Sequence, residues 1–149
     1  MKLSKDQFLK DTLKHCGIPY IWGGESTKGC DCSGLMEILL SQWGLNPDGR
    51  QTAQRFYDFF SKAPYGVVIK DRSQVREGDL ILYGKSISKI THIAMALDNV
   101  DMVEAGGGGS AVTTVEKALA ANAKVRMAKI DRRNDIMAFV RINGLEILK

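Results

Sequence analysis

The sequence has few of the residues that mark disulfide-rich or membrane-spanning chains. It has three cysteines and three prolines in 149 residues, and an odd, sparse set of cysteines argues against a disulfide framework. No apolar run approaches the roughly 18 residues of a membrane span. The residues before Gly17 carry charges every few positions and lack the apolar core of about 7–15 residues that a signal peptide needs. The sequence therefore predicts a chain made in the reduced cytoplasm without a signal peptide.

An excess of charge of one sign is also nearly absent. Lys and Arg outnumber Asp and Glu by 21 to 17, which gives a net charge of +4. This mild basicity suits an anionic partner. There is no dense Lys/Arg block and no basic stripe interleaved with aromatics, so nucleic-acid binding is not predicted. The length fits one domain, residues 1–149, because a domain of roughly 150 residues buries about 70% of its unfolded surface.

The pattern of apolar residues changes along the chain. Helical spacing predicts three helices in the first part and a short one later, whereas short β-branched or alternating segments after Pro64 predict strands. Helices followed by an antiparallel meander indicate an α+β domain, with N-terminal helices packed on a central antiparallel sheet. The predicted helices are Lys5–Cys16, Cys32–Trp43, Thr52–Ser61 and Thr113–Ala123, and the predicted strands are Val67–Ile69, Asp79–Tyr83, His92–Leu97, Met102–Ala105 and Ala138–Ile142.

Cys32 is the first candidate for chemistry, because it stands at the start of the second predicted helix. The free N–H groups and partial positive charge of a helix N-terminus favour a thiolate, the form that attacks carbonyl carbons. Its spacing with Met36, Leu39 and Trp43 places it on the buried stripe of the helix. A buried free cysteine that only fills space is the alternative interpretation.

His92 is the second candidate, and it is one of only two histidines in the chain. The other, His15, stands at the end of the first predicted helix, where a cation is unremarkable. On the predicted strand, His92 shares one face with Ala94 and Ala96, and the larger residues share the opposite face. Small alanines let a helix approach closely, so His92 could meet a group on that helix. A surface histidine or one satisfied in the core is the alternative.

Glu104 completes the group in this hypothesis. If Asp98 and Asn99 lie in a hairpin with a three-residue loop, the register pairs His92 with Glu104, whose Cβ atoms would then be roughly 5 Å apart. A carboxylate there could hold the imidazole tautomer and stabilise its cation. Asp98, Asn99 and Asp101 are weaker candidates for the same role, and a solvated side chain is the alternative for Glu104.

Two other patterns predict neither a metal nor another cofactor. Cys30–Cys32 forms a single CxC pair and lacks the second ligand pair of a structural zinc site. The glycine run Gly106–Gly109 is followed by Ser-Ala rather than Lys-Ser/Thr, so it is not a phosphate-binding loop. The run either lets the backbone approach a substrate beside Glu104 or simply serves as a loop.

Four segments resemble the NlpC/P60 cysteine peptidases, in the right order along the chain. Gly17–Gly24 (GIPYIWGG) and Gly29–Leu35 (GCDCSGL) resemble the PYxWGG stretch and the DCSGL helix start around the nucleophile of that family. Arg76–Tyr83 (REGDLILY) is similar to its PGDL-type strand, with Glu77 where proline is usual. His92–Leu97 (HIAMAL) is similar to its HVGIY-type histidine strand.

The resemblance covers about residues 5–142 and implies a papain-like α+β fold. It implies Cys32 as the nucleophile and His92 as its base. In the family the third polar residue, commonly another histidine, lies twelve positions after the base, where this chain has Glu104. A carboxylate at this position would bind an imidazolium more strongly and favour the Cys⁻/His⁺ pair.

Three further residues match positions that contact the substrate in the family. Tyr20 resembles the tyrosine that lines such sites, and Asp31 and Ser33 resemble residues that hold the free amine of the substrate. The alternatives are simple packing for Tyr20 and capping of the helix by Asp31 or Ser33.

The function implied by the resemblance is hydrolysis of peptidoglycan stem peptides, at the amide between D-γ-glutamate and the diamino acid. Single-domain copies without a signal resemble those of bacteriophage tail or lysis gene sets, so partners among such phage proteins are an expectation. A cytoplasmic peptidase that recycles wall fragments is another option. The remaining alternatives are a tail or wall-binding module that has lost its chemistry, and an amidase or acyltransferase of the same Cys–His design.

Overall fold

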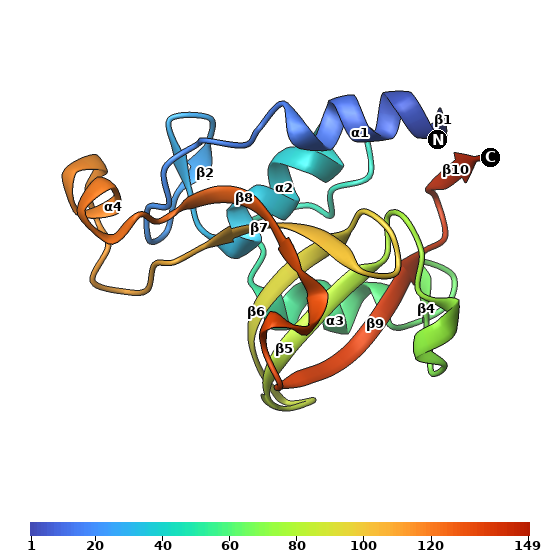
Figure 1. The fold of residues 1–149 in the computed structure, drawn as a ribbon. Coiled ribbons are helices and arrows are strands. Elements are labelled where there is room, and N and C mark those ends of the chain that lie inside the picture. The colour runs from blue at the N-terminus through green and yellow to red at the C-terminus, as the bar shows by residue number, and fades with distance from the viewer.

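A six-stranded antiparallel sheet forms the centre of the structure, a computed structural model that describes all residues from Met1 to Lys149 (Figure 1). Its middle strands carry long apolar stretches, and its edge strands are short or charged, as expected for a sheet covered mainly at its centre. The strand order is β4 (Gly66–Val68), β9 (Ile136–Ile142), β5 (Leu80–Ser86), β6 (Lys89–Ala96), β7 (Asp101–Gly106) and β8 (Lys124–Lys129).

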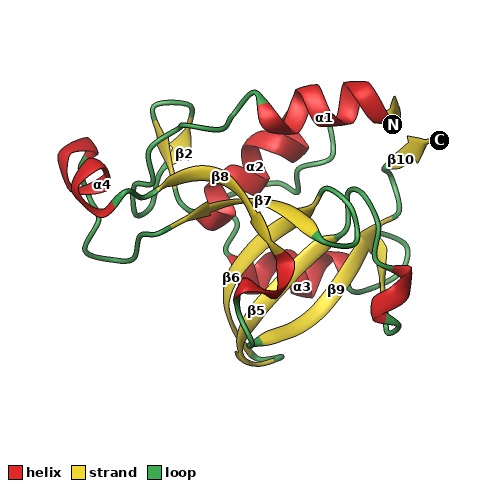
Figure 2. Ribbon diagram, viewed as in Figure 1, coloured by secondary structure: helices red, strands yellow, loops and turns green.

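The structure has four α-helices, two of which pack against this sheet (Figure 2). Each begins after a Ser, Asp or Thr whose side chain accepts a hydrogen bond from a backbone amide of the first turn, which satisfies an otherwise unpaired donor. In Figure 1, α4 lies away from the sheet centre, between β7 and β8 in the chain. The helices are α1 (Lys5–Leu13), α2 (Cys32–Gln42), α3 (Ala53–Phe60) and α4 (Val115–Ala121).

Short elements complete the fold. The strand β1 (Lys2–Ser4) pairs in parallel with β10 (Glu146–Leu148), so the two termini lie side by side (Figure 1). A small hairpin, β2 (Glu25–Ser26) and β3 (Gly29–Cys30), precedes α2. Two 3₁₀ turns are present at Arg72–Gln74 (η1) and Ile130–Arg132 (η2).

The core divides into two clusters, and α2 belongs to the larger one. Leu35 and Leu39 of α2 lie in the same buried cluster as Ile93 and Met95 of β6. The alanine face of β6 belongs to the second cluster. The predicted close approach of a helix to the alanine face is therefore wrong. The leucine stripe of α2 buries more apolar surface against the large residues of β6.

The predicted helices and strands are confirmed, with ends that differ by a few residues. The first helix ends at Leu13 rather than Cys16, because the chain turns after Lys14. The strand β8 was not predicted. Its sequence KVRMAK has as many charged as apolar residues, a composition that suits an edge strand but gives little signal of its own.

The register between β6 and β7 differs from the predicted one. Met95 pairs with Val103 and Ala96 with Met102, so the predicted direct pairing of His92 with Glu104 is wrong. The cause is the turn: Oδ1 of Asp98 accepts the N–H groups of Val100 and Asp101 at 2.7 and 2.6 Å, and such a turn sets where the loop begins. Continued along this register, His92 is a diagonal neighbour of Glu104 on the same face, which long side chains can still bridge.

Candidate active site

A pocket of about 570 Å³ brings most of the predicted site residues together. Beyond Met95 and Val103 the strands β6 and β7 are no longer paired, and they diverge (Figure 1). The pocket lies beside this divergence and is lined by residues of α2, β6, the Gly106–Gly109 loop and η2. Among its lining residues are Tyr20, Asp31, Cys32, Ser33 and His92.

Cys32 is the first residue of α2. Burial raises the pKa of its thiol and the neighbouring Asp31 carboxylate raises it further, to about 11, although backbone N–H groups of Ile93, Ser33 and Cys32 itself act in the opposite direction. Burial therefore opposes the effect of the helix N-terminus, and a thiolate at Cys32 stays a prediction. The contact with Ile93 places the sulfur against β6 next to His92, so a base is close by.

His92 is buried on β6, and its ring orientation is fixed by Glu104. Nε2 of His92 lies 2.8 Å from Oε1 of Glu104. An ionised carboxylate can only accept, so Nε2 carries a proton, and the neutral form of such a ring has its lone pair on Nδ1. The ring also packs against Tyr83, with centroids 5.5 Å apart. His92 and Cys32 both line the pocket, and Nδ1 is the ring nitrogen that the bond to Glu104 leaves free.

Glu104 is fully buried, with 0% of its surface exposed. Burial opposes its ionisation, but hydrogen bonds from His92 and Arg132 outweigh burial and lower its pKa to about 2. Arg132 donates from Nε at 2.9 Å and from Nη2 at 2.8 Å, and Arg126 donates from Nε at 3.2 Å. A buried carboxylate is tolerable only when it is paired in this way.

Sequence reasoning missed both arginines. Arg126 stands directly opposite Glu104 in the β7–β8 ladder, and that ladder could not be drawn without predicting β8. Arg132 follows in η2. The only signal was chemical, because a glutamate proposed for a buried site requires a cationic partner somewhere in the chain.

Asp31 has the capping role that was its alternative interpretation. Its Oδ1 accepts from the Gly34 N–H at 2.8 Å and from the Ser33 hydroxyl at 3.2 Å. Its Oδ2 accepts from the Gly23 N–H at 3.0 Å and from Nη2 of Arg50 at 3.1 Å. A substrate amine would have to share these oxygens with the donors already present.

Tyr20 and the glycine run pack against each other. A Cβ added to Gly108 would collide with the ring of Tyr20, and one added to Gly106 would lie 2.7 Å from Oε2 of Glu104. Tyr20 is nearly fully buried, and burial raises its pKa above the ordinary range. The glycines therefore allow the loop to lie against Tyr20 and Glu104, and its approach to a substrate stays a prediction.

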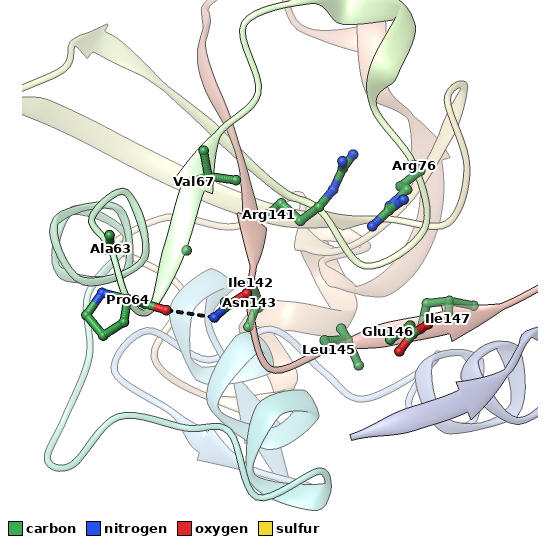
Figure 3. Close-up of a pocket in the computed structure, with 11 residues that line it drawn as sticks. Ala63, Pro64, Val67, Arg76, Arg141, Ile142, Asn143, Leu145, Glu146 and Ile147 are labelled. Carbon is green, nitrogen blue, oxygen red and sulfur yellow. Dashed lines mark hydrogen bonds between the residues drawn. The ribbon is translucent and has the colours of Figure 1, made fainter.

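A second pocket, of about 510 Å³, lies elsewhere, along β4, β9 and β10 (Figure 3). The side chains of Arg76 and Arg141 lie near one end of it, and the hydrogen bond from Asn143 to the Pro64 carbonyl lies near the other. No cysteine or histidine lines it, so it offers no group for Cys–His chemistry. No cluster of three or more His, Cys, Asp or Glu side chains could hold a metal ion.

The sequence matches the model of the NlpC/P60 family over residues 17–129. The chain belongs to the NlpC/P60 family. The matched segment includes Cys32, His92 and Glu104 and ends before Arg132. No helix of the structure is both long and apolar enough to cross a membrane.

Relatives of known activity share this NlpC/P60 segment. Peptidoglycan endopeptidase RipA of Mycolicibacterium smegmatis is 35% identical over 117 residues, which are 70% of this chain and 21% of that protein. The gamma-D-glutamyl-L-lysine dipeptidyl-peptidase of Bacillus cereus is 31% identical over 100 residues, 66% of this chain and 27% of that protein. The chain therefore spans less than a third of the length of these relatives.

Solved structures of NlpC/P60 domains have the same fold. The domain of the peptidoglycan hydrolase SagA superposes with a TM-score of 0.64 at 22% identity and covers 93% of this chain and 98% of that one. RipD of Mycobacterium tuberculosis, described as a non-catalytic domain adapted to peptidoglycan binding, superposes with a TM-score of 0.65 at 21% identity over 92% and 95% of the two chains. Since both superpose equally well, the fold alone does not decide between catalysis and binding.

Proposed function

We propose that this protein is a cysteine peptidase that hydrolyses an amide bond in peptidoglycan stem peptides. The observation that carries the proposal is the 2.8 Å hydrogen bond between Nε2 of His92 and Oε1 of Glu104, in a pocket that Cys32 also lines. This arrangement leaves Nδ1 of a neutral imidazole free to act as the base, oriented by a third group as in other triads.

The mechanism follows from these three groups. Nδ1 of His92 takes the thiol proton as the sulfur of Cys32 attacks the amide carbonyl carbon. The backbone N–H of Cys32 and a second donor stabilise the oxyanion. The imidazolium then protonates the leaving amine, and the C–N bond breaks to leave a thioester. A water molecule, deprotonated by His92, hydrolyses the thioester and restores the thiol.

The proposed bond joins D-γ-glutamate to the diamino acid of the stem peptide. The B. cereus relative is described as acting on a γ-D-glutamyl-L-lysine linkage, and RipA and SagA are described as acting on peptidoglycan. Stem peptides of this kind carry free carboxylates. The cationic side chains of Arg132 and Arg133 line the pocket, and they suit such a ligand.

A binding module without catalysis is the second candidate. The raised pKa of Cys32 favours it, because a neutral buried thiol is a weak nucleophile. The non-catalytic description of RipD shows that the fold can serve this purpose. An amidase or acyltransferase of the same design would use the same Cys32–His92 pair on another acyl group.

The deciding experiment is mass spectrometry of purified peptidoglycan fragments of both diamino-acid types. The fragments are incubated with wild-type protein and with the Cys32→Ala variant. We expect new fragments that end at γ-glutamate with wild-type protein only. Cleavage of a different bond that depends on Cys32 would show that the proposed bond is wrong. The absence of any cleavage by folded protein, on either type of peptidoglycan, would favour the binding module.

The route by which the chain reaches the wall stays a prediction of the sequence. We propose delivery by bacteriophage tail or lysis proteins, as the resemblance to the sequences of such gene sets implies. Co-purification of the chain with phage particles would support this, and its absence from them would contradict it.

A further inference from the structure

Two arginines that line the active-site pocket, Arg132 and Arg133, belong to a cluster with more cationic than acidic side chains. Arg126, Arg132 and Arg133 lie in and just after β8. Arg126 and Arg132 both pair with Glu104, and Arg133 pairs with Asp135. Three cations therefore face two carboxylates, which leaves one positive charge without a counterion.

Two of these guanidinium groups are held rigidly and keep unused donors. Arg132 donates hydrogen bonds to Glu104 from Nε at 2.9 Å and from Nη2 at 2.8 Å. Arg133 donates hydrogen bonds to Asp135 from Nε at 2.8 Å and from Nη2 at 2.6 Å. Its guanidinium also lies 5.0 Å from the ring centre of Tyr83. The Nη1 group of each has no partner within the chain. A guanidinium that is already fixed along one edge loses little entropy when its other N–H groups bind a ligand.

These donors are within reach of a substrate. Both side chains are about one-third exposed, at 34% and 27%, and both line the pocket together with Cys32 and His92. Both also follow residue 129, where the match to the family model ends. Arg132 and Arg133 are therefore contributed by a segment that the family match does not include.

Arg50 also lines the pocket, but its charge is already compensated. It forms ion pairs with Glu25, Asp31 and Glu37. An anionic ligand group is therefore attracted less to Arg50 than to Arg132 and Arg133. This difference favours one position in the pocket for a ligand carboxylate.

We propose that Arg132 and Arg133 form a carboxylate-binding subsite beside the catalytic pair, and that its ligand is the free α-carboxylate of the γ-linked glutamate. The proposal rests on the proposed function and adds a specificity to it. In a γ-linked glutamyl residue, only three carbons separate the free α-carboxylate from the scissile carbonyl. Amidation of that group removes the charge, so stem peptides with an amidated glutamate should be poor substrates.

The test uses four stem peptides in which the glutamyl α-group is either a carboxylate or a carboxamide and the diamino acid is either lysine or diaminopimelate. We expect wild-type kcat/KM to favour the carboxylate about tenfold, the usual worth of a charged hydrogen bond. Arg133→Met should remove most of that preference. Arg133 is the variant of choice because Arg132 also holds Glu104. Lys129→Met removes an equal charge that pairs with Asp101 outside the pocket and should keep the preference.

A binding measurement separates this proposal from the proposed function. Calorimetry with the Cys32→Ala variant compares a γ-glutamyl peptide with its α-carboxamide, and we expect about tenfold tighter binding of the carboxylate. Because only the ligand changes in this comparison, the result can be interpreted even if Arg133→Met does not fold. Equal binding of the two forms overturns the subsite, as does an equal loss of preference in Lys129→Met. A preference that follows the carboxylate of diaminopimelate instead overturns the glutamyl assignment. Binding without any cleavage by wild type would overturn only the proposed peptidase.

Discussion

At Glu104, desolvation and ion pairing act in opposite directions. Removing a carboxylate from water costs several kcal/mol unless its partners offset this cost. Here the hydrogen bonds from His92 and Arg132 stabilise the ionised form by more than burial destabilises it, so the pKa falls to about 2. The side chain is therefore ionised at any pH at which the enzyme would work, and His92 always faces a charged acceptor rather than the neutral residue common in the family.

The stability of the protein should depend on this ionisation. The folded pKa of about 2 lies below the ordinary 4.5, so the contribution of Glu104 is complete above about pH 4.5 and is lost as pH falls through 2. The shift corresponds to roughly 3 kcal/mol, of which about 2 kcal/mol is lost by pH 3. Urea unfolding at pH 7 and pH 3 should show a larger fall in the free energy of unfolding for wild type than for Glu104→Gln. Equal falls would contradict the low pKa.

The reactivity of Cys32 gives a second test at the scale of single residues. Because burial and the Asp31 carboxylate raise the thiol pKa to about 11, alkylation by iodoacetamide should accelerate with pH up to that region. Asp31→Asn removes the charge but keeps a capping oxygen, so it should move the midpoint to lower pH. Ser33→Ala, which changes no charge, is the control. Peptide fragmentation distinguishes Cys32 from Cys30. A wild-type midpoint well below 8 would instead show a resting thiolate paired with His92.

At the scale of elements, periodicity predicted the helices and strands that pack in the core and missed a strand that is held mainly by backbone pairing. The stripe of α2 and the apolar strands could be predicted because burial imposes a spacing on them. The edge strand β8 is held by its ladder to β7 and has little apolar signal. The β6–β7 register depended on a side-chain turn at Asp98, which spacing alone does not reveal. Arg126 and Arg132 could not be predicted as partners of Glu104, because neither β8 nor its register was predicted.

The loop Gly106–Gly109 offers a matched pair of substitutions. A Cβ at Gly108 meets the ring of Tyr20, whereas one at Gly109 meets nothing within 4 Å. We expect Gly108→Ala to displace Tyr20 and lower the free energy of unfolding by about 1–3 kcal/mol, the usual cost of overpacking. Gly109→Ala should be close to neutral. Thermal unfolding of the two variants measures the difference, and equal midpoints would show that the loop does not rest on Tyr20.

At the scale of the whole molecule, the site joins parts of the chain that are far apart in sequence. Cys32 comes from the first helix that packs on the sheet, His92 and Glu104 from the middle strands, and Arg132 from beyond β8. The resemblance to the NlpC/P60 family indicated the first three, because its motifs contain Cys32 and His92 and its third polar residue is spaced twelve positions after the histidine. It could not locate Arg132, which lies past the matched segment. Only the folded chain shows that Glu104 has a cationic environment in place of a second histidine.

The charge of the whole chain leads to a prediction about ionic strength. The net charge is +4, and peptidoglycan carries many carboxylates, so long-range attraction should raise the rate of encounter with the polymer. Raising the salt concentration from 0.1 M to 1 M shortens the screening length from about 10 Å to about 3 Å. We expect kcat/KM on polymeric wall to fall several-fold over this range. On a short stem peptide it should fall less, because the contacts with Arg132 and Arg133 are at hydrogen-bond range and are screened weakly. An equal fall for polymer and peptide would locate the salt effect in the pocket and not in the charge of the whole molecule.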